Sequence, residues 1–88
     1  MPRGKVTRIP DGDTIKIKDG PWIRLAKVNT PEKGQPGFEE AREVLKNLVS
    51  QKVVTYTSVA EDAYGRTVAN VKVGNKSVNQ TMREKGYK

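Results

Sequence analysis

The sequence predicts a mainly β fold with helices, namely a five-stranded OB-type Greek-key barrel with one main helix and a short C-terminal helix. Three observations support this prediction. Short segments with alternating apolar and polar residues recur along the chain. One long segment with helical periodicity stands between the third and the fourth of them. The chain has no strand–helix–strand rhythm and no internal repeat. Its 88 residues are expected to form one domain, spanning 1–88.

Three strands are expected before the main helix. The alternation at 5–9 and at 14–18 predicts two strands, and residues 10–12 between them carry turn chemistry. The third strand is predicted at 21–28, starting at Pro21, where a missing backbone N–H is tolerated. Trp22 is either a base-stacking platform for nucleic acid or a half-buried strand residue of the kind that β-sheets favour.

The main helix is predicted at 38–49. Five apolar residues of this segment fall on one helical face, namely Phe38, Ala41, Leu45, Leu48 and Val49. Glutamates near its start and Lys46 near its end suit the helix dipole. We interpret these glutamates as a solvated helix face rather than a metal site.

Two more strands and a short helix complete the chain. Residues 52–58 and 67–73 are rich in β-branched residues and predict the fourth and fifth strands, with a turn at 60–65. Ser77 or Asn79 is expected to cap a short helix that continues to Lys85. The order of the strands in the sheet does not follow from these patterns.

The charge balance points to a polyanionic partner. The chain has 17 Lys and Arg against 10 Asp and Glu, a net charge of +7. Attraction to the phosphates of nucleic acid explains such a charge; solubility alone is the alternative explanation. No apolar run is long enough to span a membrane.

The amino-acid composition restricts the chemistry. The sequence contains no cysteine and no histidine, which excludes thiolate catalysis and removes the commonest general base. Hydrolysis would therefore depend on carboxylates, arginines and an oxygen-ligated hard cation. Residues 1–5 have no apolar signal segment, so the compartment stays open: cytoplasmic if the chain is complete, secreted if a signal was removed.

The stretch from Arg24 to Glu32 has the residues of a phosphoryl-transfer site. Pro31 keeps Thr30 extended, so Arg24 and Glu32 stand at opposite ends of a short stiff segment with Asn29 between them. Further candidates stand in two turns, namely Asp11, Asp13, Tyr64 and Arg66. Two arginines, carboxylates and neutral oxygen donors suit metal-assisted phosphoryl transfer. Plain turns and ordinary salt bridges are the alternative interpretation of each of these residues.

Four motifs, in this order and with this spacing, resemble the staphylococcal nuclease (thermonuclease) family. They are Asp11-Gly12-Asp13-Thr14, Arg24-Leu25 with Val28-Asn29-Thr30-Pro31-Glu32, Tyr64-Gly65-Arg66, and Val78-Asn79. The chain departs from the family pattern at Asn29, where the best-known members carry a metal-binding aspartate. The loop at 33–37 is also shorter, and the chain stops before the C-terminal helix of the full-length enzyme. The resemblance is thus to a short member or a fragment.

The resemblance implies the same OB-type fold and a calcium-dependent nuclease that acts on DNA and RNA with low sequence specificity, single strands preferred. It implies that Asp13, Asn29 and Thr30 hold Ca²⁺. It further implies that Arg24 and Arg66 clamp the phosphate, that Glu32 orients or deprotonates the attacking water, and that Tyr64 lies beside the nucleotide. We expect a monomer. The rival hypothesis is a non-catalytic nucleic-acid-binding module of the same family, which Asn29 and the missing C-terminal segment favour.

Overall fold

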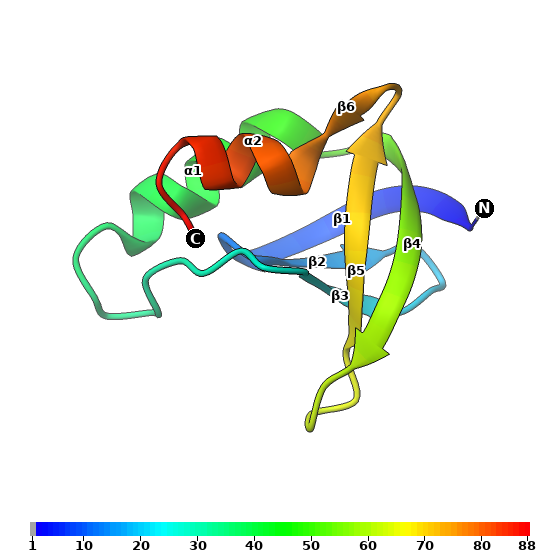
Figure 1. Ribbon diagram of the computed structural model, residues 1–88, viewed down its shortest axis with the longest axis horizontal. Coiled ribbons are helices and arrows are strands. Elements are labelled where there is room, and N and C mark those ends of the chain that lie inside the picture. The colour runs from blue at the N-terminus through cyan, green and yellow to red at the C-terminus, as the bar shows by residue number, and fades with distance from the viewer. Residues whose placement is uncertain (1) are drawn as a thin grey trace.

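The computed structural model describes residues 2–88 and confirms the predicted fold class. Five strands build the barrel: β1 (Arg3–Asp11), β2 (Thr14–Ile17), β3 (Trp22–Leu25), β4 (Val53–Glu61) and β5 (Thr67–Val73). Hydrogen-bonded neighbours follow the order β3-β2-β1-β4-β5, and β3 also pairs with β5 (Figure 1). This last pairing is parallel and the others are antiparallel. The sheet therefore closes into a five-stranded ring, which removes the free strand edges.

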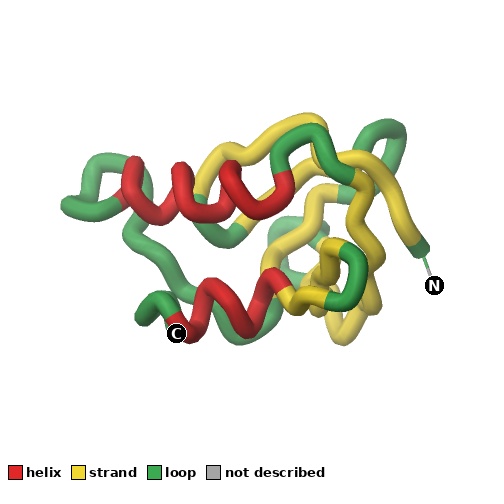
Figure 2. Tube along the Cα trace, turned by 90° about the horizontal axis from the view of Figure 1, so that it is seen from above, coloured by secondary structure: helices red, strands yellow, loops and turns green. Residues whose placement is uncertain are grey.

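Two helices lie on one side of the strands (Figure 2). α1 (Phe38–Val49) has the predicted bounds and buries four of the five side chains on its predicted apolar face, namely Phe38, Ala41, Leu45 and Val49, whereas Leu48 is partly buried. α2 (Val78–Glu84) begins at Ser77, whose hydroxyl accepts a hydrogen bond from the Gln80 backbone N–H. Ser77 is therefore the cap, and Asn79 has another role. Neither helix is long and apolar enough to cross a membrane.

The core fills the barrel and the space under the helices. Its members are aliphatic side chains that alternate along the strands, together with residues from both helices: Val6, Ile15, Ile17, Ile23, Leu25, Leu45, Val54, Val71 and Met82. Full burial of each such side chain contributes roughly 1.5–3 kcal/mol. The core fixes which strand residues face outward, and the candidate site residues are among these.

The main differences between the structure and the predicted elements lie in four places. β1 continues through Pro10 and Asp11, which were predicted to be in a turn, and β4 extends to Glu61. β3 ends at Leu25 rather than at residue 28, because Lys27 adopts a left-handed conformation (φ +58°) that a strand does not accommodate. A two-residue strand, β6 (Lys76–Ser77), pairs with β5 outside the ring and is too short for a pattern to predict.

Candidate active site

A polar cavity of about 190 Å³ lies where β1 ends and β2 begins. It is lined by Asp11, Asp13, Arg24, Asn29, Thr30, Pro31, Glu32 and Arg66. Six of the seven predicted site residues are in this set, although they come from four separate parts of the chain. Tyr64 is not in the set. The barrel brings these residues together because Thr14 and Arg24 are paired across β2 and β3, and β5 runs alongside β3.

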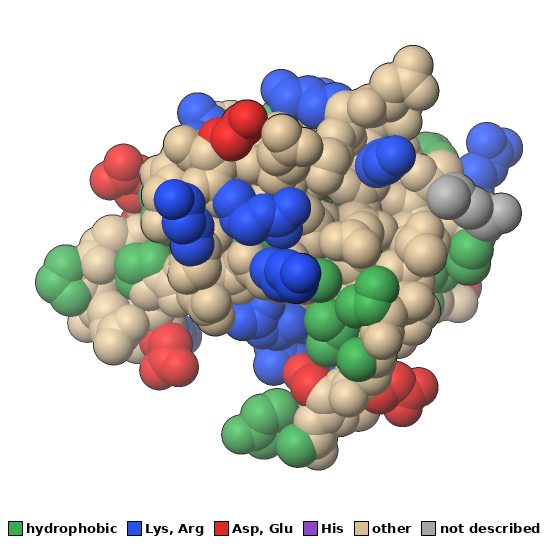
Figure 3. All heavy atoms as spheres, in the orientation of Figure 1, with side chains coloured by type: hydrophobic (Ala, Val, Ile, Leu, Met, Phe, Trp, Pro, Cys, Tyr) green, Lys and Arg blue, Asp and Glu red, His purple; other side chains and the backbone are tan. Residues whose placement is uncertain are grey.

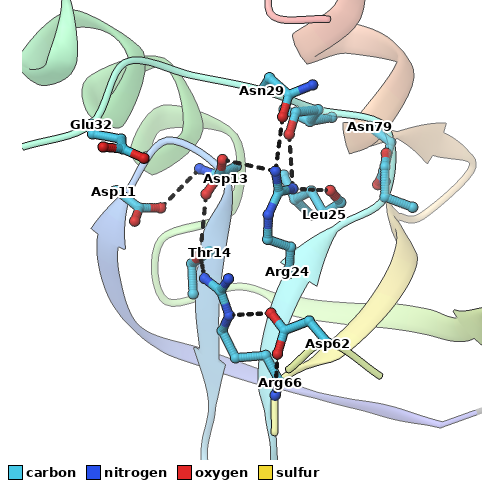
Figure 4. Close-up of polar contacts among 12 residues, drawn as sticks. Asp11, Asp13, Thr14, Arg24, Leu25, Asn29, Glu32, Asp62, Arg66 and Asn79 are labelled. Carbon is cyan, nitrogen blue, oxygen red and sulfur yellow. Dashed lines mark hydrogen bonds and ion pairs between the residues drawn. The ribbon is translucent and has the colours of Figure 1, made fainter. Parts of the chain in front are cut away.

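Arg24 is the hub of this cavity (Figure 4). Its Nη1 donates hydrogen bonds to the carbonyl oxygens of Leu25 (2.6 Å) and Val28 (2.8 Å), and its Nη2 donates to Oδ1 of Asn29 (3.0 Å). The same Nη2 lies 3.4 Å from Oδ2 of Asp13. Arg24 thus holds the irregular segment after β3 in shape, and it also places a positive charge in the cavity.

Arg66 enters the cavity from the start of β5. Its Nε donates to Oδ2 of Asp62 (2.6 Å), and its Nη1 donates to the Thr14 hydroxyl (3.1 Å). Burial by itself would raise the pKa of Asp62, but hydrogen bonds from the Arg66 backbone and side chain and from the Tyr64 N–H hold that pKa below its usual value. Asp62 is therefore a charged partner that fixes the direction of the guanidinium.

Two carboxylates stand close together at the β1–β2 turn. Oδ1 of Asp11 accepts a hydrogen bond from the Asp13 backbone N–H (3.1 Å), and Asp13 accepts one from the Thr14 hydroxyl (3.1 Å). Burial and the neighbouring Asp11 raise the pKa of Asp13 to about 6, although Arg24 and Thr14 act in the opposite direction. The negative charge on Asp13 is thus poorly compensated, and a cation in the cavity would stabilise it.

Glu32 lies on the same side of the cavity as Asp11 (Figure 4). Its backbone N–H is held by the Gln35 side chain at 2.7 Å, whereas its carboxylate has no hydrogen bond or ion pair with the described residues. Within residues 2–88, Glu32 is therefore the acidic residue of this cavity that keeps its carboxylate available for a water molecule or a cation.

The donor set suits a hard cation. Within residues 2–88 no three acidic side chains converge into a ready-made metal site. Asp11 and Asp13 supply two neighbouring carboxylates, and Thr30 and Glu32 line the same cavity. Oxygen-only donors of this kind match Ca²⁺ rather than a transition metal. The amide oxygen of Asn29 is turned to Arg24, so its approach to a cation would require that contact to open.

Tyr64 lies beside the cavity rather than within it. The tip of the β4–β5 turn leaves its side chain 85% exposed, and its ring centroid is 5.6 Å from the Arg66 guanidinium carbon. At this distance the ring forms a cation–π contact with the Arg66 guanidinium. Tyr64 therefore presents an exposed ring next to the guanidinium that enters the cavity.

Three residues support the site although none was among the predicted site residues. Asp62 and Thr14 orient Arg66, and the spacing of Asp62 four residues before Arg66 was the sequence signal for this pair. Asn79 is fully buried: its Oδ1 accepts from the Val71 N–H, and its Nδ2 donates to the carbonyls of Ala26 and Ala69. Asn79 thereby ties α2 and β5 to the segment that carries the cavity residues, a role that its place in a short sequence motif did not reveal.

Positive charge is spread over the surface. Figure 3 shows one face of the molecule, where Lys and Arg side chains lie across the middle and most of the visible Asp and Glu side chains lie near the outline. This arrangement agrees with the net charge of +7 of the whole chain. Such a surface attracts polyanions over distances of about a Debye length.

Comparison with known proteins agrees with this geometry. Residues 22–88 match the family model described as staphylococcal nuclease homologue. An uncharacterized endonuclease of Escherichia coli is 39% identical over 83 residues, which cover 90% of this chain and 54% of that protein. The thermonuclease of Staphylococcus hyicus is 37% identical (93% of this chain, 55% of that protein), and the micrococcal nuclease of Shigella flexneri is 40% identical (78% and 41%).

The chain spans about half the length of the curated relatives it matches. The family match itself covers most of the chain, from the start of β3 to the last residue, and includes Arg24, Glu32 and Arg66. The barrel closed by β3 and β5, the cavity and the matched residues lead to the same assignment: this chain belongs to the staphylococcal nuclease family.

Proposed function

We propose that this protein is a calcium-dependent nuclease that hydrolyses phosphodiester bonds of DNA and RNA with low sequence specificity. The observation that carries the proposal is the convergence of Arg24, Arg66 and Glu32 on one polar cavity beside a pair of aspartates. Phosphoryl transfer needs positioned positive charge and a held nucleophile more than it needs covalent chemistry. The cavity offers both.

The two arginines contribute to the reaction in different ways. Arg66 uses two of its five N–H donors on protein partners, so its remaining donors can bind phosphate oxygens. Arg24 has three hydrogen bonds and an ion pair within the protein. We infer that Arg66 makes the main contact with the phosphate, while Arg24 holds the segment that carries Glu32 and adds charge.

Glu32 is the group that acts on the attacking water. Its free carboxylate can accept a hydrogen bond from water and orient it in line with the leaving oxygen, or accept its proton. Neither arginine is a proton donor, because guanidinium stays protonated. The leaving oxygen therefore takes its proton from solvent water. By resemblance to the family, the 5′-oxygen leaves and a 3′-phosphate end remains.

Calcium, when bound, would place positive charge opposite the phosphate oxygens and the water. Asp13 is the charged residue that would hold it directly, with the carbonyl oxygen of Thr30 and, after release from Arg24, the amide oxygen of Asn29. This ligand set carries little negative charge, so the affinity of the free protein for Ca²⁺ should be low.

The rival function is nucleic-acid binding without catalysis. One structural observation favours it: both arginines already form ion pairs with carboxylates, Arg24 with Asp13 and Arg66 with Asp62. In that case the cavity would be a structural charge network, and the basic surface would remain as a binding face.

A cleavage assay separates the two functions. Single-stranded DNA and RNA are incubated with the protein in Ca²⁺ and in excess EDTA, with Glu32→Gln as the control variant. We expect cleavage in Ca²⁺, none in EDTA and at least a hundredfold loss in Glu32→Gln. Full activity in EDTA would contradict the calcium mechanism. Binding without cleavage by the parent protein would support the non-catalytic module.

A further inference from the structure

A second groove, larger than the candidate active site, lies between β1, α1 and the start of β3. Its volume is about 440 Å³, against about 190 Å³ for the polar cavity. Trp22, Pro10 and the stem of Arg8 supply its apolar and long side chains, and Arg42 and Lys46 border it from α1. None of the described residues that line it is acidic.

Arg8 and Trp22, which line this groove, belong to a row of side chains across three strands. Arg8 of β1 is opposite Lys16 of β2, and Lys16 is opposite Trp22 of β3. Directly opposite residues of antiparallel strands share a face, so the row lies on the outside of the barrel. The Lys16 ammonium donates to the carbonyls of Ile17 and Gly20 and stands 6.0 Å from the Trp22 ring. These contacts hold the row in place and leave the Trp22 side chain open to solvent (38% exposed).

The positive charges around the row have almost no partners. Arg8 is exposed and makes no ion pair with the described residues. Arg42 uses its Nε on the Ile9 carbonyl (2.7 Å), which fixes the side chain and leaves the rest of the guanidinium available. Lys46 is half-exposed and has a weak surface contact with Glu43 at 4.0 Å. The groove thus combines an open aromatic ring with unbalanced cations.

We propose that this groove is a second nucleic-acid site, in which a base of a single strand stacks on Trp22 while phosphates contact Arg8, Arg42 and Lys46. Aromatic platforms beside backbone-tracking cations are how proteins bind single strands without sequence preference. Trp22 and Arg24 share the outward face of β3 and are two residues, about 7 Å, apart along the strand. One strand can therefore occupy the groove and the cavity together; this part of the inference rests on the proposed nuclease function.

The sequence supplies its own probe of the groove, because Trp22 is the single tryptophan. In EDTA, where no cleavage is expected, titration with a short oligothymidylate should quench tryptophan fluorescence in a saturable manner. Trp22→Ala should weaken binding of a labelled oligonucleotide, followed by anisotropy, at least fivefold, and Trp22→Phe should restore most of it. Binding without a change in tryptophan emission would overturn the proposal.

Charge reversal tests the phosphate contacts. Arg8→Glu and Lys46→Glu should each weaken binding and lower the salt dependence by about one counterion. The matched control is Lys76→Glu, an exposed lysine of β6 that causes the same change in net charge away from the groove. If Lys76→Glu weakens binding as much as Arg8→Glu, the effect is general attraction and the groove is not a site. Equal quenching by polyglutamate, or a concentration-dependent emission shift without oligonucleotide, would also overturn the proposal.

The two proposals fail separately. Arg66→Ala should lower the cleavage rate by roughly 10² or more and leave the tryptophan quenching intact. Quenching without any cleavage by the parent protein would disprove the nuclease and support the groove. Cleavage without quenching would disprove the groove alone. Circular dichroism and thermal unfolding of each variant establish that the fold is retained.

Discussion

The polar cavity and the groove beside Trp22 both border the outward face of β3, through Arg24 and Trp22, but their charges are arranged differently. In the cavity each arginine has a carboxylate partner, Asp13 for Arg24 and Asp62 for Arg66. In the groove the cations lack such partners among the lining residues. Paired charges are held in fixed directions, whereas unpaired surface charges attract a polyanion without orienting it. We therefore expect the cavity to control the rate of reaction and the groove to control affinity.

The largest expected effect comes from breaking the cavity. Arg66→Ala should lower the cleavage rate by roughly 10² or more, the scale for one preorganised charge-stabilising donor. Because Arg66 faces Thr14 and Asp62 at the rim, the fold should remain stable. Arg24→Ala should cost a similar factor in rate and also lower the melting temperature, since two backbone carbonyls lose their donor.

Single-turnover kinetics measures the cleavage rate of each variant, and thermal unfolding measures its melting temperature. Arg66→Lys is the control that keeps the charge but loses the planar fork of donors. Unchanged turnover in Arg66→Ala would mean that this arginine serves only its ion pair with Asp62.

The second prediction removes the partly buried charge of Asp13 from the cavity. The folded protein raises the pKa of Asp13 from 3.8 to about 6 through burial and Asp11. Between these values the folded state binds more protons than the unfolded state, so Asp13 makes stability fall as pH rises through pH 4–6. In EDTA at pH 7, Asp13→Asn should increase the free energy of unfolding by at most about 3 kcal/mol, and the gain should vanish below pH 4.

Urea unfolding at a series of pH values checks this expectation. Glu61→Gln, at the exposed end of β4, is the control and should give a small difference that does not follow the same pH window. A stability loss at pH 7 in Asp13→Asn would show that the ion pair with Arg24 outweighs burial and the repulsion from Asp11. Cleavage should be lost in Asp13→Asn in either case.

The smallest expected effect concerns the affinity of the cavity for a cation. Replacing an amide by a carboxylate adds one negative charge at an oxygen donor, so Asn29→Asp should strengthen Ca²⁺ binding to the free protein by about tenfold, roughly 1.4 kcal/mol. The new carboxylate would also compete for Arg24, which Asn29 now contacts at 3.0 Å. Calorimetric titration at constant ionic strength measures the difference. Equal affinities would mean that residue 29 stays with Arg24 and does not reach the cation.

The sequence by itself determined the elements and the chemistry available to them. Alternation predicted five strands, and helical periodicity predicted α1 with its bounds, because core burial imposes these periods on the residues directly. The absence of histidine and cysteine restricted the site to oxygen and guanidinium groups. The motif order predicted the family, which the family match confirms. It also predicted six residues that the barrel brings together around one cavity.

Only the tertiary structure decided which partners these residues have. The pairing of β3 with β5 brings Arg66 next to Thr14, 52 positions away, and no local pattern carries such a contact. The same holds for Asn79, whose buried amide joins α2 to Ala26 and Ala69. β3 ends at Leu25, ahead of the left-handed Lys27, and Arg24 holds the segment that follows through hydrogen bonds to the carbonyls of Leu25 and Val28. The sequence specifies the side chains, but long-range strand pairing decides which of them meet, because it alone sets the distances between segments remote in the chain.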